Sequence, residues 1–317
     1  MSIKTAFVYP GQGSQFVGMG ADLMHVRPRL TEVFKHVEAV TGRPVIEPMV
    51  HGPEDRLRET RTAQLVLFTF GAAMTRALAA EGVVPQLVAG HSLGEFTALV
   101  AGGWLDLDEA AATVVQRADA MARCCHERTG AMAAVIGTDP DEVARVLARH
   151  PGRRDDGRPR TVVIANYNSP RQTVISGDAA IVEEIGESIR TESIAVVQPL
   201  SVAGAFHSPL MGSAQDTLMA TIAGLPLRRG HTPMVSSVTG GLVTDLEHYR
   251  DALAHQITAP VHWTRTARRI LGHRPQRIVE VGPGTTLRSL IRKIDRGQEI
   301  HPCGSTNELR AVTGTRG

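Results

Sequence analysis

Short apolar runs alternate along this chain with longer segments in which apolar residues recur every three or four positions. The runs at residues 5–10 and 85–89 predict buried strands, because short apolar stretches bounded by turn residues are typical of parallel sheets. The longer segments have the spacing of amphipathic helices. They predict helices at residues 29–40, 64–81 and 108–127. Strands that alternate with helices in this way favour a parallel sheet covered by helices.

A different order of elements is predicted between residues 130 and 200. It reads strand, helix, strand, strand, helix, strand, which is the order of a ferredoxin-like unit. These elements are predicted at residues 131–137, 139–150, 161–168, 172–177, 179–190 and 194–200.

The first alternation resumes after residue 201. Helices are predicted at residues 210–223, 249–257, 264–272 and 286–294, and strands at 233–238 and 277–282. We therefore expect an α/β fold in which residues 1–128 and 201–317 form a parallel-sheet body. A smaller ferredoxin-like α+β subdomain at residues 129–200 interrupts that body. Residues 311–317 are expected to form a frayed tail.

The composition is that of an ordinary globular protein and excludes several functions. Apolar residues make up 42% of the 317 positions, and the formal net charge of +2 is too balanced to indicate binding to nucleic acid. Aromatic residues, at 4%, are too few for base-stacking platforms. No window approaches the ~18 apolar residues of a membrane-spanning helix, and three cysteines, two of them adjacent, cannot form a disulfide framework. We expect a cytoplasmic protein that binds neither nucleic acid nor membranes.

The sequence Gly90-His91-Ser92-Leu93-Gly94 follows the second predicted strand and precedes a helical pattern of small residues. A serine in this setting is typical of a nucleophile elbow, a turn so tight that side chains two residues either side of the serine would clash. Glycine at both of these positions removes the clashes. The turn would push the hydroxyl out of the sheet, and the N-terminus of the following helix would face any negative charge that develops there.

A serine hydroxyl needs a base, and 13 histidines are available. His91 is adjacent to Ser92, but neighbouring side chains diverge on a tight turn. His207 lies where an apolar strand meets a small-residue turn and then a helix, and active sites of open α/β sheets gather at such strand ends. His207 is the better candidate, with a core or capping histidine as the alternative. No carboxylate stands out as a third member of a triad, which weighs against a plain hydrolase.

A glycine-rich loop at residues 11–20 follows the first predicted strand, but it does not match a nucleotide-binding motif. A dinucleotide fingerprint would need glycine in place of Phe16, and a phosphate-binding loop counted from Gly13 would need lysine in place of Met19. A loop of this kind beside an elbow is better suited to supply backbone amides to an oxyanion hole.

Seven short motifs extend over essentially the whole chain, namely PGQGSQ, GHSLGE, VVQRADAM, NYNSP, GAFHSPLM, QITAPVHW and VGPGTTL. In their order and spacings they resemble the motifs of malonyl-CoA:acyl carrier protein transacylases. The same pattern occurs in the related acyltransferase domains of polyketide synthases. The resemblance implies a hydrolase-like α/β body with an inserted ferredoxin-like subdomain, in agreement with the elements predicted above.

The resemblance also implies roles for single residues. Ser92 is the nucleophile and His207 the base, and a main-chain carbonyl that falls on Gln256 holds the histidine. The backbone amides of Gln12 and Leu93 form the oxyanion hole. Arg117, Phe206, His91, Asn168 and Gln64 are the implied substrate-binding residues.

Some of these substrate-binding roles have alternatives. Arg117 would hold the free carboxylate of a malonyl group in a bidentate pair, although without the resemblance its position favours an exposed arginine on an amphipathic helix. Phe206 would lie beside the acyl α-carbon, where the resemblance associates an aromatic residue with malonyl rather than branched units. Asn168 would lie near the catalytic histidine, with Asn166 as a rival. The family's usual proline after Gln64 is absent here, which leaves the role of Gln64 open.

The resemblance implies an acyltransferase that moves a malonyl group from CoA to the phosphopantetheine thiol of an acyl carrier protein through a Ser92 acyl-enzyme. Its partners would be malonyl-CoA, as a thioester substrate, and the carrier; no metal ion and no tightly bound cofactor are expected. One alternative is a trans-acting polyketide acyltransferase for another extender or acyl unit. An acyl-thioester hydrolase of the same fold is disfavoured by Arg117, and a non-catalytic docking module is disfavoured by the presence of Ser92 and His207.

An acidic carrier would dock on a basic face. Two arginine-rich helices after the catalytic histidine are candidates for that face, and a solvated surface is the alternative. The candidates are Arg265, Arg268 and Arg269 in the first helix and Arg288, Arg292, Lys293 and Arg296 in the second, followed by Arg153 and Arg154 in the subdomain loop.

Overall fold

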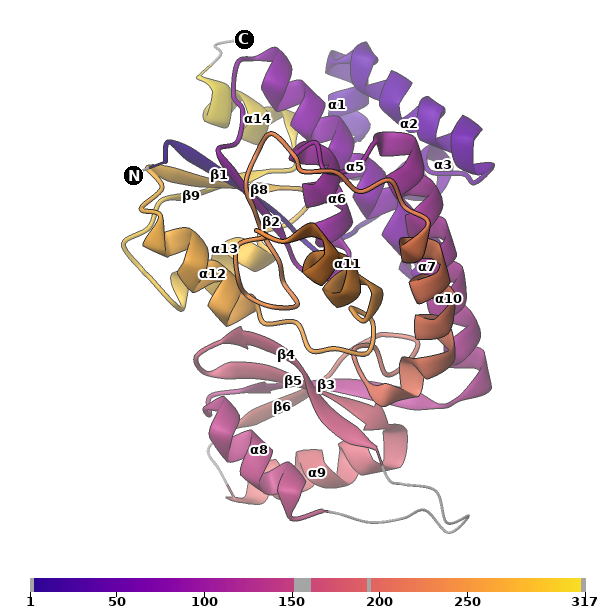
Figure 1. Ribbon diagram of the computed structural model, residues 1–317, viewed down its shortest axis with the longest axis vertical. Coiled ribbons are helices and arrows are strands. Elements are labelled where there is room, and N and C mark those ends of the chain that lie inside the picture. The colour runs from indigo at the N-terminus through magenta and orange to yellow at the C-terminus, as the bar shows by residue number, and fades with distance from the viewer. Residues whose placement is uncertain (1–2, 151–160, 193–194, 315–317) are drawn as a thin grey trace.

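A parallel sheet forms the larger part of the molecule in the computed structural model, which describes residues 3–150, 161–192 and 195–314 (Figure 1). The described strands of this sheet have the order β7-β2-β1-β8-β9, and all neighbours are parallel. Because β1 has β2 on one side and β8 on the other, the loops after these three strands meet at one edge of the sheet. The strands are β1 (Thr5–Tyr9), β2 (Leu87–Gly90), β7 (Met234–Val235), β8 (Arg277–Val281) and β9 (Ile300–Cys303).

Helices cover both faces of the parallel sheet. Successive side chains of a strand point to opposite faces, so Phe7 and Tyr9 pack among the helices α5, α6 and α7, whereas Ala6 and Val8 pack against α12 and α13. The helices of this part are α1 (Ala21–Val26), α2 (Pro28–Thr41), α3 (Ile46–Val50), α4 (Glu54–Arg58), α5 (Thr60–Ala80), α6 (Gly94–Ala101), α7 (Leu107–Glu127), the 3-10 helix η1 (Pro209–Met211), α10 (Gly212–Ala223), α11 (Leu246–Ala254), α12 (Trp263–Gly272), α13 (Thr286–Arg292) and α14 (Thr306–Thr313).

A second, antiparallel sheet is inserted between α7 and η1, with strand order β4-β5-β3-β6. Ala133 and Val135 of β3 pack on α8 and α9, while Met132 and Ala134 face the larger part. The predicted α/β fold with an inserted ferredoxin-like unit is confirmed. The elements are β3 (Gly130–Ile136), α8 (Pro140–Ala148), β4 (Val162–Ser169), β5 (Gln172–Asp178), α9 (Ala179–Glu192) and β6 (Val196–Pro199).

Strand β4 joins the inserted sheet to the larger part. The amide of Tyr167 donates to the carbonyl of Val261 (2.9 Å), and the amide of Val261 donates to the carbonyl of Ala165 (2.8 Å). The ring of Tyr167 also stacks on His262, with ring centroids 5.1 Å apart. These contacts hold the end of β4 opposite the edge of the parallel sheet where the loops after β1 and β2 meet.

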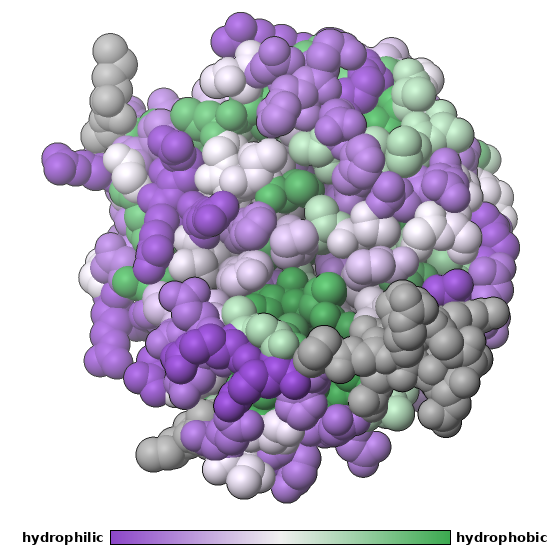
Figure 2. Space-filling view, turned by 60° about the horizontal axis from the view of Figure 1, so that its bottom comes forward, coloured by the Kyte–Doolittle hydropathy of each residue, from purple (hydrophilic) through white to green (hydrophobic). Residues whose placement is uncertain are grey.

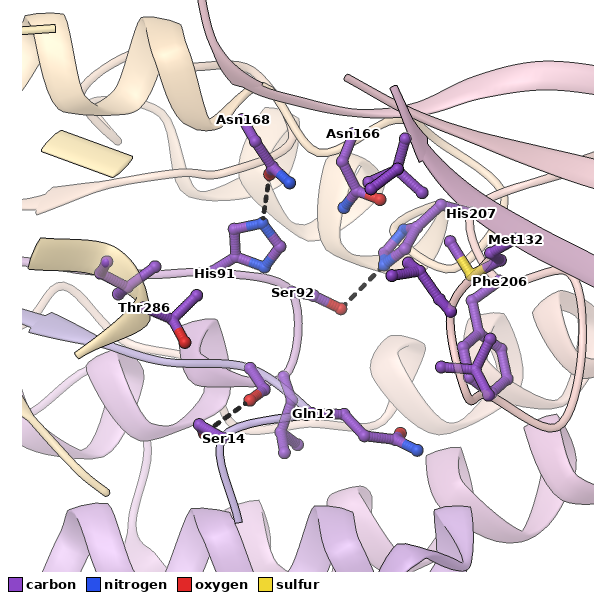
Figure 3. Close-up of a pocket in the computed structure, with 18 of the residues that line it drawn as sticks. Gln12, Ser14, His91, Ser92, Met132, Asn166, Asn168, Phe206, His207 and Thr286 are labelled. Carbon is purple, nitrogen blue, oxygen red and sulfur yellow. Dashed lines mark hydrogen bonds between the residues drawn. The ribbon is translucent and has the colours of Figure 1, made fainter. Parts of the chain in front are cut away.

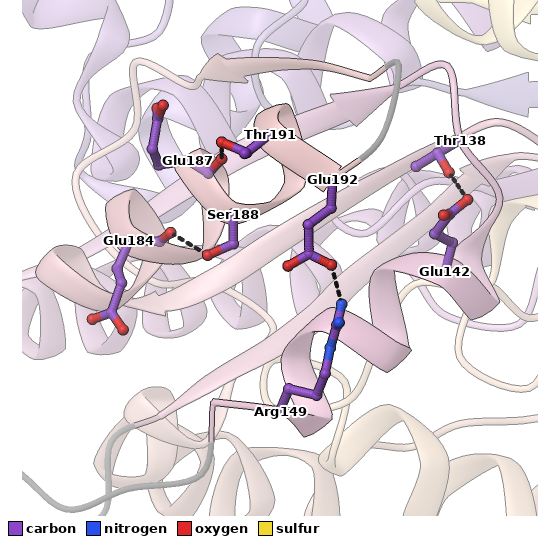
Figure 4. A network of polar contacts seen from close by, with 8 residues as sticks. All are labelled: Thr138, Glu142, Arg149, Glu184, Glu187, Ser188, Thr191 and Glu192. Carbon is purple, nitrogen blue, oxygen red and sulfur yellow. Dashed lines mark hydrogen bonds and ion pairs between the residues drawn. The ribbon is translucent and has the colours of Figure 1, made fainter.

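Apolar packing, rather than ion pairing, holds the outer helices of the inserted sheet. Arg149 pairs with Glu192 at the end of α9, and the hydroxyl of Thr138 donates to Glu142 at 2.8 Å (Figure 4). An exposed ion pair contributes about 0–1 kcal/mol. Burial of an aliphatic side chain such as Ile185, which is fully buried here, contributes about 1.5–3 kcal/mol.

One described helix, α5, is long and apolar enough to meet a criterion for a membrane span, but 78% of that stretch is buried inside the protein. It is the core helix that packs against α2, α6 and α7. On the face shown in Figure 2, hydrophilic side chains predominate around a hydrophobic patch near the middle. The most exposed large apolar side chains in the described residues, Phe16, Val84 and Val196, lie far apart in the sequence.

Several elements differ from the sequence predictions. Residues 311–313, expected to fray, belong to α14, which buries Leu309 and Val312. Strand β9 was missed because His301 and Pro302 interrupt its apolar run; proline is tolerated there because β9 is an edge strand. The strand predicted at 233–238 has a ladder of only two residues, because the chain turns after it. The short helices α1, α3 and α4 were also not predicted.

Candidate active site

A cleft of about 250 Å³ lies between the two sheets. Residues 11–14 after β1, residues 91–93 after β2 and the start of α13 line one side of it, and Met132, Asn166 and Val174 of the inserted sheet line the other. Figure 3 shows Ser92 and His207 facing each other inside this cleft. The cleft is thus at the carboxyl edge of the parallel sheet, where open α/β sheets bind ligands.

Ser92 lies on a strained turn between β2 and α6. Its φ angle is 51°, a left-handed conformation that non-glycine residues adopt rarely. A side chain at Gly90 would place Cβ 1.9 Å from the carbonyl carbon of Gly94, and one at Gly94 would place Cβ 2.1 Å from the carbonyl oxygen of Tyr9. The two glycines therefore permit the close approach that the predicted nucleophile elbow requires.

His207 is within hydrogen-bonding distance of Ser92, with 2.8 Å between its Nε2 and the serine Oγ. Its Nδ1 is 3.0 Å from the carbonyl oxygens of both Gln256 and Ala259. Because carbonyls only accept, Nδ1 carries the proton and Nε2 is left to accept the serine hydroxyl proton. Burial, together with the positive charge of Arg117, lowers the pKa of His207 to about 3, so the free imidazole is neutral near pH 7.

The two expected oxyanion-hole residues lie on either side of the elbow. Leu93 directly precedes α6, and Gln12 lies in the loop after β1, on the side of Ser92 opposite His207 in Figure 3. Neither backbone amide has an acceptor within the described part of the chain. Both amides could therefore donate to a negatively charged oxygen formed beside Ser92.

Arg117 is buried next to Ser92, with only 1% of its surface exposed. The alternative of an exposed arginine on an amphipathic helix is therefore wrong. Its Nη1 donates to Oε1 of Gln64 (2.6 Å), its Nε and Nη2 donate to Oε1 of Gln256 (3.2 and 3.1 Å), and Nη2 is 3.2 Å from the Oγ of Ser92. Burial lowers the pKa of Arg117 to about 9, and the charge of Glu95 opposes this shift.

Gln64 and Gln256 hold Arg117 from opposite sides. Both side chains are buried, and their amide oxygens accept three of the guanidinium hydrogen bonds. Nη1 retains a second hydrogen, and Nη2 directs its second hydrogen at the Oγ of Ser92, so the guanidinium offers donors beside Ser92 for the carboxylate of an acyl group. Gln64 is thus placed to orient Arg117 even without the proline that follows it in the family pattern.

His91 and Asn168 form a pair across the cleft rather than a second contact to His207. Nε2 of His91 is 2.9 Å from Oδ1 of Asn168, and burial lowers the pKa of His91. Asn168 lines the same cleft as His207, and its hydrogen-bond partner is His91. In Figure 3 the rival, Asn166, lies between Asn168 and His207.

Phe206 forms part of an apolar wall of the cleft. It is 6% exposed and lies next to His207 in the chain, and Met132, Val174, Leu200 and Val202 also line the cleft. An apolar portion of a substrate could pack against this wall near Ser92.

The two basic helices border different hollows. Residues Arg292, Lys293 and Arg296, at and after the end of α13, line a hollow with Ser169, Pro170 and Arg171; we call these six residues the α13 patch. It adjoins the active-site cleft, because Nζ of Lys293 donates to Oε1 of Gln172 (2.6 Å) and Gln172 lines the cleft. Arg265, Arg268 and Arg269 of α12 line a separate hollow, Arg288 lies on α13 and is partly buried, and Arg153 and Arg154 lie outside the described residues.

Glu95, Ser237 and Tyr249 are site residues that sequence reasoning missed. Glu95 is fully buried, three residues after Ser92, and contacts Gln256, Ser237 and Tyr249. A single acid within the apolar stretch that follows Ser92 was the available signal, because a buried charge requires partners.

Comparisons with known proteins agree with this geometry. An acyl transferase domain model matches residues 6–310. The malonyl CoA-acyl carrier protein transacylase of Bacillus subtilis is 32% identical over 92% of this chain and 91% of its own, and that of Escherichia coli K12 is 34% identical over 91% and 92%.

Solved structures superpose closely. The crystal structure of malonyl-CoA:acyl carrier protein transacylase from Xanthomonas oryzae has a TM-score of 0.93 and 35% identity, with 99% of both chains covered. A malonyl-transacylase solved in complex with its type II polyketide synthase acyl carrier protein has a TM-score of 0.91 and 32% identity, with 98% of this chain and 100% of that chain covered. The chain belongs to the acyl transferase domain family, among the malonyl-CoA:acyl carrier protein transacylases.

Proposed function

We propose that this protein transfers a malonyl group from CoA to the phosphopantetheine thiol of an acyl carrier protein through an acyl-enzyme at Ser92. The relatives above are named for this reaction. The observation that carries the proposal is the buried guanidinium of Arg117 beside the nucleophile, with Nη2 3.2 Å from the Oγ of Ser92.

The first half-reaction makes the acyl-enzyme. Neutral His207 accepts the proton of the Ser92 hydroxyl at Nε2 while Oγ attacks the thioester carbonyl. The oxygen of the tetrahedral intermediate accepts hydrogen bonds from the amides of Gln12 and Leu93, beside the N-terminus of α6. The C–S bond then breaks, and the CoA sulfur takes the proton from His207.

The second half-reaction returns the enzyme to its starting state. The thiol of the carrier gives its proton to His207 and attacks the Ser92 ester. The C–O bond breaks, and Ser92 recovers the proton as the malonyl thioester leaves. The nucleophile, base and donors all belong to this chain, so the reaction needs no bound cofactor or metal ion.

Arg117 accounts for a preference for a dicarboxylic acyl group. In a malonyl ester of Ser92, one methylene separates the reacting carbonyl from the free carboxylate, so that carboxylate stays near Oγ and within reach of Nη1 and Nη2. A charged, bidentate pair in a buried site is stronger than a neutral contact. An acetyl group has the same reacting carbonyl but nothing to pair with Arg117.

The α13 patch is the docking surface that we propose for the carrier. It adjoins the cleft through Gln172, whereas the α12 arginines line a separate hollow. A structural neighbour was solved in complex with an acyl carrier protein. A basic surface at the mouth of the cleft would steer an acidic carrier so that its arm enters toward Ser92. We further propose that the protein acts in the reducing cytoplasm, in keeping with its three unpaired cysteines.

Intact-protein mass spectrometry tests the proposal. After incubation with malonyl-CoA, the parent should gain the mass of one malonyl group, and Ser92→Ala should gain none while keeping the folded circular dichroism spectrum of the parent. Malonylation of the alanine variant would refute the assignment of Ser92. A hydrolase would release malonate and CoA without forming malonyl-carrier, so adding carrier protein separates transfer from hydrolysis.

A further inference from the structure

Glu95 is a buried acid that the proposed mechanism does not use. It lies in the first turn of α6, three residues after Ser92, and its carboxylate accepts four hydrogen bonds. Oε1 accepts from the amide of Ser237 and from the hydroxyl of Tyr249, both at 3.3 Å. Oε2 accepts from the hydroxyl of Ser237 (2.6 Å) and from Nε2 of Gln256 (3.0 Å).

Two of the four partners, the amide of Ser237 on Oε1 and Nε2 of Gln256 on Oε2, can only donate, so each oxygen of Glu95 must accept, which favours the ionised form. Burial raises the pKa of Glu95, and the hydrogen bonds to Ser237 and Gln256 oppose that shift. Its negative charge also acts on Arg117, whose pKa it raises against the effect of burial. One residue, Gln256, bridges the two charges.

Glu95 sets the orientation of the Gln256 side-chain amide. Its Nε2 donates to Glu95 and to the main-chain oxygen of Ser92 (3.1 Å), and its Oε1 accepts from Nε and Nη2 of Arg117. A half-turn of this amide would bring its NH2 group toward the guanidinium, so that donors would face donors. The acceptor at Glu95 makes the observed direction the favourable one.

We propose that Glu95 is a positioning residue for dicarboxylate recognition, which fixes the amide of Gln256 and through it holds the guanidinium of Arg117 beside Ser92. Glu95 itself is not among the residues that line the cleft, so it acts through Gln256 and Arg117. This inference rests on the proposed function, because it explains the selectivity of that same site. It predicts that Glu95 controls the ratio of malonyl to acetyl transfer more than the transfer of either group alone.

The test is Glu95→Gln, with kcat/KM for acylation measured with malonyl-CoA and acetyl-CoA on the same preparation. The glutamine has the shape of Glu95 but no charge and one acceptor oxygen fewer. The ratio of kcat/KM for malonyl-CoA to that for acetyl-CoA should fall roughly tenfold, because the hydrogen bonds between the malonyl carboxylate and a less firmly held Arg117 guanidinium are weakened. Both substrates report on the same folded fraction, so loss of folded protein alone would not change the ratio.

Two further variants separate charge from packing. Tyr249→Phe removes one neutral donor and leaves the carboxylate, so the ratio should stay within about twofold of the parent. Glu95→Asp keeps the charge but withdraws it from Gln256 by one methylene, so the ratio should fall. This second variant decides the question if Glu95→Gln does not accumulate as folded protein.

The pH dependence gives a readout that a purely structural role would not move. The titratable groups around Arg117 are Glu95 on α6, His207 before η1 and Tyr249 on α11, which contacts Glu95. Burial lowers the pKa of His207 and raises the pKa of Tyr249, so both groups are neutral near pH 7. Burial also raises the pKa of Glu95, but the hydrogen bonds from Ser237 and Gln256 oppose that shift and favour its charged form. Without that charge the pKa of Arg117 falls, and Glu95→Gln should lose its remaining malonyl preference at a lower pH than the parent.

The outcomes are distinct. A fall in the ratio for Glu95→Gln, with the ratio preserved in Tyr249→Phe, supports the inference. Equal losses for malonyl and acetyl groups in Glu95→Gln or Glu95→Asp overturn it while leaving the proposed function intact. A parent protein that fails to load malonyl at all refutes the proposed function, and the inference with it.

Discussion

Replacing Arg117 by alanine should slow malonyl acylation far more than acetyl acylation. The carboxylate of a malonyl ester would pair with a guanidinium that is 1% exposed, and a hydrogen bond to a charged group contributes about 1.5–3 kcal/mol. At about 1.4 kcal/mol per decade, malonyl acylation should fall by roughly ten- to a hundredfold. Acetyl acylation loses only the contact between Nη2 and the hydroxyl of Ser92, worth about 1 kcal/mol, and should fall by about fivefold or less.

The assay is the initial rate of CoA release with each thioester, under single-turnover conditions and without carrier, so that only the first half-reaction is observed. Arg117→Lys is the matched control. It keeps a positive charge but not the planar fork, so its malonyl rate should lie between those of the parent and the alanine variant. An equal loss for malonyl and acetyl groups in Arg117→Ala would show that Arg117 supports the structure and does not bind the carboxylate.

The pairing of Arg117 with the malonyl carboxylate can also be tested in the parent protein by varying the pH. Arg117 pairs with a carboxylate only while protonated, and burial lowers its pKa to about 9. Malonyl preference should therefore be complete near pH 7 and should decline as the pH rises through about 9. Acetyl acylation should follow no such decline, because His207, with its pKa lowered to about 3, is already neutral throughout this range. Parallel pH profiles for the two thioesters would contradict the assignment.

Three other predictions follow from the cleft and its surroundings. Reversing charge in the α13 patch with Arg292→Glu and Arg296→Glu should slow malonyl transfer to the carrier without slowing self-acylation, and the defect should be smaller at high salt. The matched reversal at Arg268 and Arg269 of α12 should change the transfer rate little. If both pairs of substitutions slow transfer equally, the carrier docks elsewhere. Phe206 should exclude a methyl group on the acyl α-carbon, so malonyl-CoA should load roughly tenfold faster than methylmalonyl-CoA, and Phe206→Ala should narrow the difference. Gly90→Ala should reduce the free energy of unfolding by about 3 kcal/mol or more in urea denaturation, because its Cβ would overlap Gly94. Gly212→Ala should change that free energy by about 1 kcal/mol or less, because apart from its chain neighbours and its own helix backbone no atom lies within 4 Å of the new Cβ.

Local chemistry made the elbow and the alternating elements predictable from the sequence. The clash avoided at Gly90 is with Gly94, four positions along the chain, and turn geometry depends on such neighbours. The clash avoided at Gly94 is with Tyr9 of β1, and only the pairing of β1 with β2 brings these two residues together. The order of strands and helices also follows from local periodicity, which is why the inserted unit was recognised without a structure. Strand β9 and helix α14 were missed because their local signals are weak, and only packing against the sheet stabilises them.

The environment of each site residue was decided by the tertiary structure. Arg117 on its own helix has the pattern of an exposed residue, and it is buried because Gln64 and Gln256, 53 and 139 positions away, meet it next to Ser92. Asn168 was expected near His207, and its hydrogen bond with His91 could not be anticipated, because it depends on the position in which contacts with Val261 hold β4. The sequence motifs identified which residues belong to the site. Burial, hydrogen-bond partners and the resulting charge states depend on contacts between distant segments, and those contacts form only when the two sheets pack together.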